Sequence, residues 1–214
     1  MDAAKLQSKI YKGYGKAAQR IGFMSDVYRT ATASTPIATG NKIASLYASF
    51  NAEDMGYKKP NKYGHPTWWC LIDGSGLQVG DYIKNLHDGT FFIAAMQQAL
   101  PILVVSCNTV ISVLRPMQQT AKGAVGYNAD TVATEVSRLT AFPASVLAAG
   151  TGDRNGTLPG DTKFPQFTIL VPNVSGVEIR TSDIINDDIG RRFVVISAEL
   201  TDLGWRLIVM QAVA

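Results

Sequence analysis

The chain contains little charge and few of the residues that commonly carry catalytic or metal chemistry. Of its 214 residues only 17% are charged, and there are two cysteines and two histidines. Soluble domains usually have roughly 25% charged residues. Because hydrophobic residues make up 46% of the chain, this composition favours a protein whose surface is largely covered by neighbouring subunits. A monomer with a neutral surface is the alternative.

Further absences exclude several classes of protein. A net charge of +3 and a pI near 8.8 are only mildly basic, far below the cationic load of a dedicated nucleic-acid binder. Two cysteines, Cys70 and Cys107, do not make a disulfide framework, and we expect buried thiols in strands and synthesis in a reducing cytoplasm. The start, MDAAKLQSKIYKGYG, lacks the apolar core of a signal peptide. Two glutamines and a proline interrupt the longest apolar region, 91–107, so no transmembrane helix is expected.

Residues 2–22 have the spacing of an amphipathic helix. Apolar residues recur every three or four positions and predict one packed face: Ala3, Leu6, Ile10, Tyr14, Ala17 and Ile21. Glycines at 13 and 15 each weaken a helix by up to about 1 kcal/mol, so the helix needs a partner surface. A basic stripe runs along its flank: Lys5, Lys9, Lys12, Lys16 and Arg20. The stripe is either a solvated polar face or a docking surface for an acidic protein, with nucleic acid or membrane less favoured.

Two polar segments follow the helix. Residues 29–41, which include TATASTPIATGN, are small, polar and marked by proline and glycine, so they predict an extended arm or linker. The segment GYKKPNKYGHP sets aromatic rings among lysines, and Tyr57, Lys59 and Tyr63 are its candidate interaction residues. Such rings can stack on bases or anchor a loop in the groove of a protein neighbour.

The rest of the chain has mainly β patterns. We predict a mainly β (α+β) fold with duplicated antiparallel β-meander or barrel units, an N-terminal amphipathic helix and a short inserted helix. The inserted helix is expected over DTVATEVSRL, with Val132, Val136 and Leu139 on one side. Four segments are predicted: an N-terminal helix and extended arm over 1–62, a first β unit over 63–116, a helical and loop insertion over 117–165, and a second β unit over 166–214.

An internal repeat supports the duplication. Asp81-Tyr82-Ile83 aligns with Asp183-Ile184-Ile185, Gly89 with Gly190, and Phe92-Ile93 with Phe193-Val194. The shared order of strands and turns favours a duplicated unit, although two unrelated meanders with similar turns are an alternative. We assign both aspartates a structural role, because a carboxylate before a turn can accept backbone N–H bonds. We also expect exposed sheet edges at which copies of the chain pair.

Catalytic and metal-binding patterns are missing from the sequence. His65 and His87 are far apart and have no acid or thiol at metal spacing, so exposed polar positions are expected. Nucleophile-elbow, Walker and HExxH motifs do not occur. Asp183, Asp187 and Asp188 are interpreted as turn residues and not as a calcium site, because the closing glutamate of a dedicated site is missing. We therefore predict that the protein is not an enzyme and uses no cofactor or metal.

The segment GRRFVVISAELTDLGWRLIVMQ, with SDIINDD upstream, resembles the C-terminal β-hairpin motif of small barrel proteins in tailed bacteriophages. That family includes head–tail joining, stopper and tail-completion proteins and barrels at the junction of tail tube and baseplate. The resemblance is clearest over residues 177–211 and fainter over 77–107.

The resemblance implies a virion structural protein, made in the host bacterial cytoplasm, that forms a ring at the tail or neck. Such rings are commonly six-fold, and their partners are further copies and other tail or neck proteins, with no small-molecule substrate and no membrane. The basic stripe would then dock on an acidic tube or portal rim, and 116–165 would reach the next ring. The alternative function is a nucleic-acid-binding module that uses the basic helix and the Tyr/Lys loop.

Overall fold

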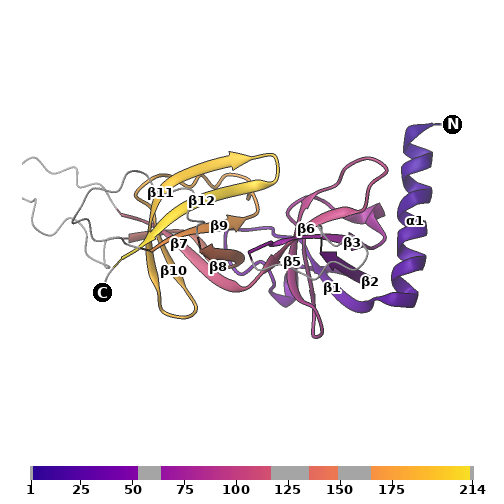
Figure 1. Ribbon diagram of the computed structural model, residues 1–214, viewed down its shortest axis with the longest axis horizontal. Helices are drawn as coiled ribbons and strands as arrows, with labels where there is room; N and C mark the ends of the chain where they lie inside the picture. The colour runs from indigo at the N-terminus through magenta and orange to yellow at the C-terminus, as the bar shows by residue number, and fades with distance from the viewer. Residues whose placement is uncertain (1, 53–63, 117–134, 149–164, 213–214) are drawn as a thin grey trace, which may run out of the picture.

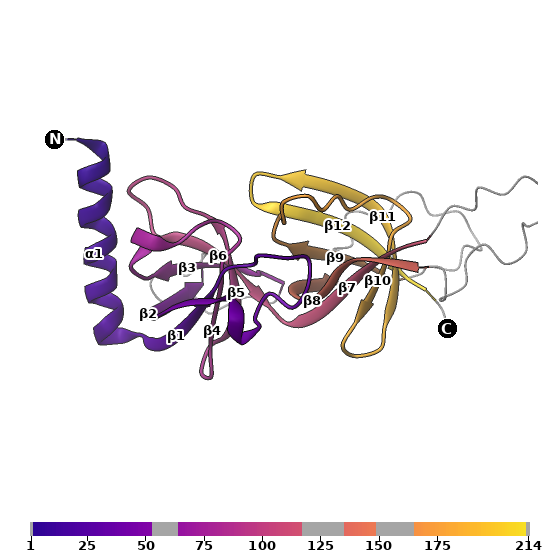
Figure 2. The same ribbon diagram turned by 180° about the vertical axis from the view of Figure 1, so that it is seen from behind.

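The computed structural model describes residues 2–52, 64–116, 135–148 and 165–212, and within them the protein is mainly β. One helix, α1 (Ala3–Ile21), precedes two closed barrels of six strands each (Figure 1). The barrels lie side by side along the long axis, and α1 flanks the first barrel on the side away from the second (Figures 1 and 2). These findings confirm the predicted fold class and N-terminal helix.

The two barrels contain successive halves of the strand sequence. Barrel 1 consists of β1 (Phe23–Tyr28), β2 (Lys42–Ala52), β3 (Thr67–Leu71), β4 (Tyr82–Asn85), β5 (Gly89–Ala95) and β6 (Ile102–Cys107). Barrel 2 consists of β7 (Thr109–Pro116), β8 (Glu135–Ala148), β9 (Gln166–Val171), β10 (Ile184–Asp187), β11 (Arg192–Thr201) and β12 (Gly204–Gln211). Short 3-10 turns occur before β2, at η1 (Thr39–Asn41), and after β3, at η2 (Gly74–Gly76).

Strand order shows that barrel 2 repeats barrel 1. Neighbours in barrel 1 follow the order β1-β2-β3-β6-β5-β4, and in barrel 2 the order β7-β8-β9-β12-β11-β10. Every adjacent pair is antiparallel, and the closing pairs β1–β4 and β7–β10 are also equivalent. The predicted duplication is therefore confirmed at the level of topology.

Strand register corrects the predicted alignment by one residue after the turn. Ile83 pairs with Phe91 in barrel 1, and Ile185 pairs with Phe193 in barrel 2. Phe91, and not Phe92, is thus the equivalent of Phe193. The glycine match misled the alignment, because a one-residue slip moves every side chain of a strand to the opposite face.

Each barrel is held by the same ion pair, in which the aspartate is buried and the arginine is partly exposed. The structural role predicted for both aspartates is confirmed. In barrel 1, Arg29 donates to both oxygens of Asp81 at 2.9 and 2.7 Å, and in barrel 2, Arg115 donates to both oxygens of Asp183 at 2.7 and 2.8 Å. Each guanidinium also donates to a loop carbonyl, and each aspartate accepts a backbone N–H three residues upstream. Hydrogen bonding to the aspartate raises the pKa of both arginines. We call these pairs the barrel clamps.

The barrels are joined by one residue and a shared apolar core. Asn108 lies between β6 and β7, and its side chain both donates to and accepts from the backbone of Val146 at 2.8 Å. The buried Tyr82 hydroxyl donates to the Pro143 carbonyl at 2.9 Å, and its ring meets Phe142 edge-on at 6.5 Å. One continuous cluster of buried side chains therefore spans both barrels. We call this the inter-barrel contact.

The predicted segment boundaries are wrong in two places. Strands β1 and β2 belong to barrel 1, although 1–62 was expected to hold only a helix and an arm. Segment 29–41 is the loop that connects β1 and β2 of that barrel. Within it, Thr35 N–H donates to the Thr140 carbonyl of barrel 2 at 2.8 Å. The first β unit was expected to extend to residue 116, but Asn108 divides the stretch 102–116 between the barrels, and β7 belongs to barrel 2. Strand β2 was not predicted because Ile43 and Tyr47 interrupt its outer, otherwise polar face with apolar side chains that are 44% and 39% exposed.

The prediction of an inserted helix over 130–139 is also wrong for the residues that the structure describes. Residues 135–148 form β8, a strand of barrel 2, and 130–134 lie outside the described residues. Leu139, Phe142 and Ala144 are buried in the core, whereas Val136 is 42% exposed. Three apolar residues at helical spacing were too short a pattern to separate helix from strand. The part of 117–165 that the structure describes is thus part of the barrel and not an excursion from it.

The expectation of exposed sheet edges is corrected as well. Each sheet closes on itself, so every strand in the described ranges has a neighbour on both sides. Closure removes the unpaired backbone groups by which edge strands join other chains. Where a strand is paired on both sides, association through the barrel must therefore use side-chain faces. No helix among the described residues combines the length and apolarity that a membrane crossing requires.

Candidate functional site

Helix α1 docks on barrel 1 through small residues that permit close approach. A Cβ at Gly15 would lie 3.0 Å from the Asp73 side chain, and one at Gly22 would lie 2.2 Å from the Ala48 carbonyl oxygen. The Tyr11 ring packs over Gly74 in η2, and Ala18 is fully buried. The helix therefore approaches barrel 1 too closely for larger side chains at these points.

The docked face differs from the predicted apolar face. Leu6 is 45% exposed and Ile21 is 63% exposed, although both were expected to pack. The residues that touch barrel 1 lie about a quarter turn around the helix from them, at 100° per residue. The physical reason is the fit of glycines against the barrel, which outweighs burial of the larger side chains. An apolar flank of α1 is consequently left partly exposed.

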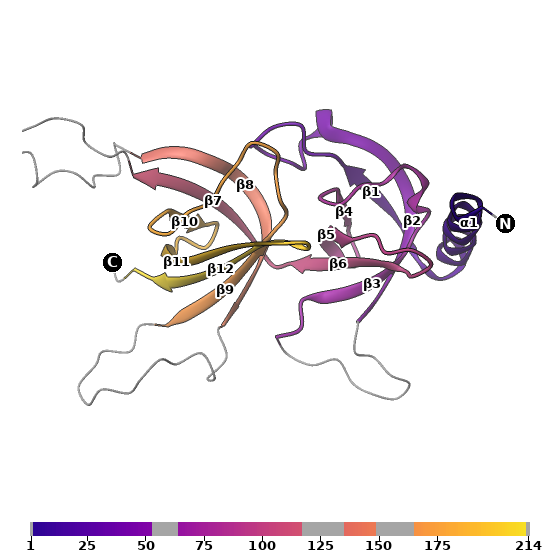
Figure 3. The same cartoon turned by 90° about the horizontal axis from the view of Figure 1, so that it is seen from above.

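The predicted basic stripe lies on the side of α1 that faces away from the barrel. All five side chains are exposed: Lys5, Lys9, Lys12, Lys16 and Arg20. The helix contains no acidic residue, and none of the five forms an ion pair with another described residue. Viewed along its axis, α1 stands clear of barrel 2 (Figure 3). The stripe is thus a continuous cationic surface, and its binding role stays a prediction.

The other predicted interaction residues cannot be placed beside it. Tyr57, Lys59 and Tyr63 lie outside the described residues, so the base-stacking loop also stays a prediction. Both histidines are exposed, as expected. His87 sits in the turn after β4 and stacks on Phe23 with ring centroids 4.0 Å apart. That contact joins the turn to the start of β1 and leaves the imidazole without a metal-binding partner among the described residues.

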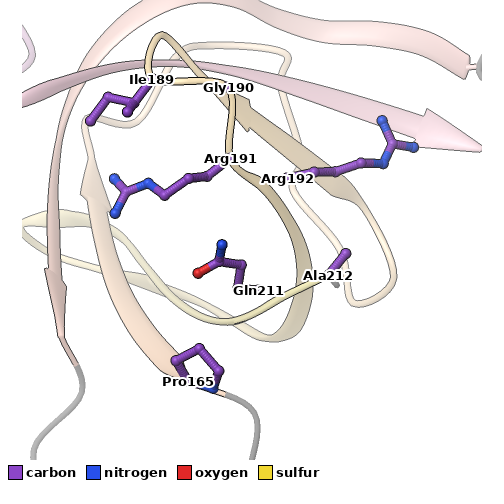
Figure 4. Close-up of a pocket in the computed structure, with 7 residues that line it drawn as sticks. All are labelled: Pro165, Ile189, Gly190, Arg191, Arg192, Gln211 and Ala212. Atoms are coloured by element: carbon purple, nitrogen blue, oxygen red, sulfur yellow. The ribbon is translucent and has the colours of Figure 1, made fainter. Parts of the chain in front are cut away.

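A cavity of about 420 Å³ opens at one end of barrel 2 (Figure 4). Seven residues line it: Pro165, Ile189, Gly190, Arg191, Arg192, Gln211 and Ala212. Arg191 and Arg192 point in opposite directions (Figure 4). Arg191 donates to Asp187 at 2.6 Å and lies over the rings of Phe167 and Phe193. Because Arg192 is likewise paired with Glu135, the charge of each guanidinium is already balanced by a carboxylate of the protein.

The remaining polar groups also serve the fold. Asp187 accepts the N–H groups of Ile189 and Arg191, so it shapes the turn before β11, as predicted. No group of three or more potential metal ligands occurs in the described ranges. Cys70 and Cys107 are free, and burial raises the pKa of both thiols far above the ordinary value. Neither thiol is therefore an activated nucleophile.

The arginines of the barrel clamps are the main feature that sequence patterns missed. Each follows a tyrosine or leucine at the end of the first strand of its barrel, as Tyr28-Arg29 and Leu114-Arg115. The sequence does not align the two arginines, because Arg29 lies 52 residues before Asp81 and Arg115 lies 68 residues before Asp183. The clamp holds strand ends together and leaves no free charge for chemistry.

Comparison with family models, with curated proteins and with solved structures found no match. The similarity of residues 177–211 to tailed-phage barrel proteins therefore stays a resemblance of short motifs. The features that bear on function are the duplicated barrels, the ion-paired arginines of the barrels and the exposed cationic face of α1.

Proposed function

We propose that this protein is a structural subunit of a tailed-phage virion, forming a ring at the neck or at the junction of tail tube and baseplate. The observation that carries the proposal is the duplication of one closed barrel, fastened twice by the same clamp and fused through a buried contact. The hairpin resemblance over 177–211 supplies the phage context. The proposal includes no substrate turnover and no cofactor.

The geometry suits a rigid building block. A single linking residue and the buried Tyr82 hydroxyl fix one barrel against the other, so both barrels present their outer faces in a constant arrangement. Helix α1 adds five exposed cations at one end, which suits an acidic surface on a neighbouring tail or neck protein. Contacts that are individually weak suffice in a ring, because each subunit engages several neighbours at once.

The direct test is the composition and structure of purified particles. We expect mass spectrometry to find the protein in intact virions at a fixed copy number, and an electron-microscopy map to place both barrels in a ring of the tail or neck. Particles made without it should be defective in tail attachment or tail completion. Its absence from virions, together with normal particles in a deletion strain, would contradict the proposal.

A nucleic-acid-binding role is the second candidate, and the unpaired basic stripe favours it. It predicts binding of short DNA or RNA that weakens steeply between about 50 and about 200 mM salt, because phosphate contacts release counterions. Fluorescence anisotropy with the double variant Lys12→Glu/Lys16→Glu tests this directly. Salt-sensitive binding that the variant abolishes would favour this role, and no binding by the wild-type protein would remove it.

A further inference from the structure

The outer face of barrel 1 that contacts barrel 2 is apolar and fully covered. Tyr82 on β4, Phe92 on β5 and Val105 on β6 are paired side by side in register. Their exposures are 0%, 1% and 3%, although their side chains point out of the barrel 1 core and join the core cluster of barrel 2. This face of barrel 1 is therefore buried only because barrel 2 packs on it. We call it the donor face.

Barrel 2 carries the same face at the equivalent positions. Ile184 on β10 pairs with Val194 on β11, and Val194 pairs with Met210 on β12. By strand order and register these three correspond to Tyr82, Phe92 and Val105. All three are apolar and each is partly exposed. Barrel 2 thus has a second donor face. Barrel 2 covers the donor face of barrel 1, but no described part of the chain covers this second face in the same way.

The surface that receives the first donor face also has a duplicate. In barrel 2 it includes Pro143, whose carbonyl accepts the Tyr82 hydroxyl. Pro143 pairs with Val110 on β7, and the equivalent pair in barrel 1 is Tyr47 with Met24 on β1. Val110 lies three residues before Val113, which pairs with Ile185 on β10. Met24 likewise lies three residues before Val27, which pairs with Ile83 on β4. Tyr47 is 39% exposed and Met24 is 51% exposed.

We propose that the second donor face packs against β1 and β2 of another copy of this chain, repeating the inter-barrel contact between molecules. The occupant of the face around Val194 is the surface around Tyr47 and Met24 of the next molecule. This inference rests on the proposed function as a ring subunit. Such a contact joins two different surfaces, so it is heterologous, and it forms a ring where the rotation closes or a filament where it does not.

The intermolecular contact is weaker than its intramolecular template for a specific reason. Ile184 stands where Tyr82 stands in barrel 1, so the hydrogen bond from the tyrosine hydroxyl to a strand carbonyl has no counterpart. The peptide link at Asn108 is also replaced by free association, which loses translational and rotational freedom. Assembly is therefore concentration-dependent, while the two barrels within one chain stay together.

A thiol cross-link between copies tests the contact directly. A disulfide is too short for this pair, because the template contact spans a whole tyrosine side chain. The variants Ile184→Cys and Tyr47→Cys are therefore purified separately, mixed and treated with a short bismaleimide, and the cross-linked dimer is measured on a denaturing gel. We expect the mixture to form it and each variant alone to form little. Asp202→Cys mixed with Tyr47→Cys is the control, because Asp202 lies in the turn between β11 and β12, eight residues beyond Val194. The native thiols stay out of the reaction, since burial raises their pKa.

A charge on the face gives the second readout. Val194→Lys should remove concentration-dependent association in light scattering, whereas Asp202→Lys, a charge change of the same sign in the exposed turn, should retain it. No specific cross-link, or wild-type association by Val194→Lys, overturns the inference. If the protein is then still found in virion rings, the proposed function stands without this contact. If the cross-link forms but virions lack the protein, the contact stands and the proposed function fails.

Discussion

Barrel 1 and barrel 2 share one topology but have different surroundings. Barrel 1 contacts α1 on one side and barrel 2 on another, and its outward-facing Tyr82, Phe92 and Val105 are buried. The corresponding side chains of barrel 2 are partly exposed. What the two barrels retain in common is the closure of the sheet and the clamp. The two donor faces differ in the size and polarity of their side chains, and only that of barrel 1 is covered within the chain.

The clamps are the first place to test this comparison, and they carry the largest expected effect. Arg115→Met leaves the Asp183 side chain, 2% exposed, without its charge partner, and such a loss costs about 3–5 kcal/mol of unfolding free energy. Arg29→Met should cost less, because Arg29 is 34% exposed against 19% for Arg115 and water reaches Asp81 more easily after its removal. Urea denaturation of the two variants checks both the size and the order. Equal losses below about 1 kcal/mol would show that the clamps do not hold the barrels closed.

The close approach of α1 to barrel 1 gives the second test. Among the described residues, barrel 2 has no equivalent helix. Gly22→Ala places a Cβ 2.2 Å from the Ala48 carbonyl oxygen, so the helix end must shift, at a cost of about 1–3 kcal/mol typical of overpacking. Gly13→Ala is the matched control. No atom lies within 4 Å of its added Cβ, and we expect a gain of up to about 1 kcal/mol from helix propensity. Thermal unfolding and helical circular dichroism measure both, and a neutral Gly22→Ala would contradict the docking geometry.

The parts of this fold that are marked by apolar periodicity or by turn residues were predicted from the sequence. The rest was missed for physical reasons. The helix, the strands around the Asp-Gly and Asp-Leu-Gly turns, and the duplication followed from spacing and turn residues. The first two strands were missed because β1 exposes Met24 and β2 exposes Tyr47, which hides the usual alternation of apolar and polar residues. Closure into barrels was predicted only as an alternative to meanders, because it depends on pairs such as β1 with β4, more than fifty residues apart.

The candidate site was predictable only in part. The basic stripe needed nothing but helical spacing, and all five residues lie exposed along one side of α1. The predicted docking face of the helix was wrong, because contact through Gly15 and Gly22 leaves no hydrophobic pattern in the sequence. The second donor face could not be found before register was known, since Ile184, Val194 and Met210 resemble any strand residues until their partners in barrel 1 are seen to be buried.

Tyr82, which barrel 2 replaces with Ile184, gives the third test. Tyr82→Phe removes the buried hydrogen bond to the Pro143 carbonyl and leaves that acceptor unsatisfied, which costs about 1–2 kcal/mol. The loss should appear as a lower urea midpoint with both barrels still folded. Ile184→Val is the control at the equivalent position and should change stability by less, because this side chain is only partly buried and makes no hydrogen bond. A neutral Tyr82→Phe would show that packing alone fixes the barrels together.

The same tyrosine predicts a pH dependence. Burial raises the pKa of Tyr82 well above its ordinary value of 10.0, so the folded protein keeps the proton that the unfolded chain releases. This contribution to stability is complete below the unfolded pKa and is lost as the pH rises from there towards the folded pKa. Up to about pH 10.5 the loss should be below about 1 kcal/mol. It should be smaller in Tyr82→Phe, and an identical alkaline loss in both proteins would rule out Tyr82 as its source.

The smallest effect concerns the residue just before each clamp aspartate. Gly80 in barrel 1 has φ +90°, and its equivalent in barrel 2, Ser182, has φ +69°. Their N–H groups make the same hydrogen bond, to Ile93 and Val195 respectively, so the left-handed conformation is required in both barrels. A non-glycine residue in this conformation costs about 1–2 kcal/mol. Replacing it with glycine removes that cost but makes the unfolded chain more flexible, which offsets part of the gain in stability. Ser182→Gly should therefore raise the unfolding free energy by about 0.5 kcal/mol in urea denaturation. Gly80→Ser should lower it by a similar amount, and opposite signs in the two barrels are the result that tests their equivalence. Losses in both variants would mean that the serine side chain stabilises barrel 2 in a way that barrel 1 does not share.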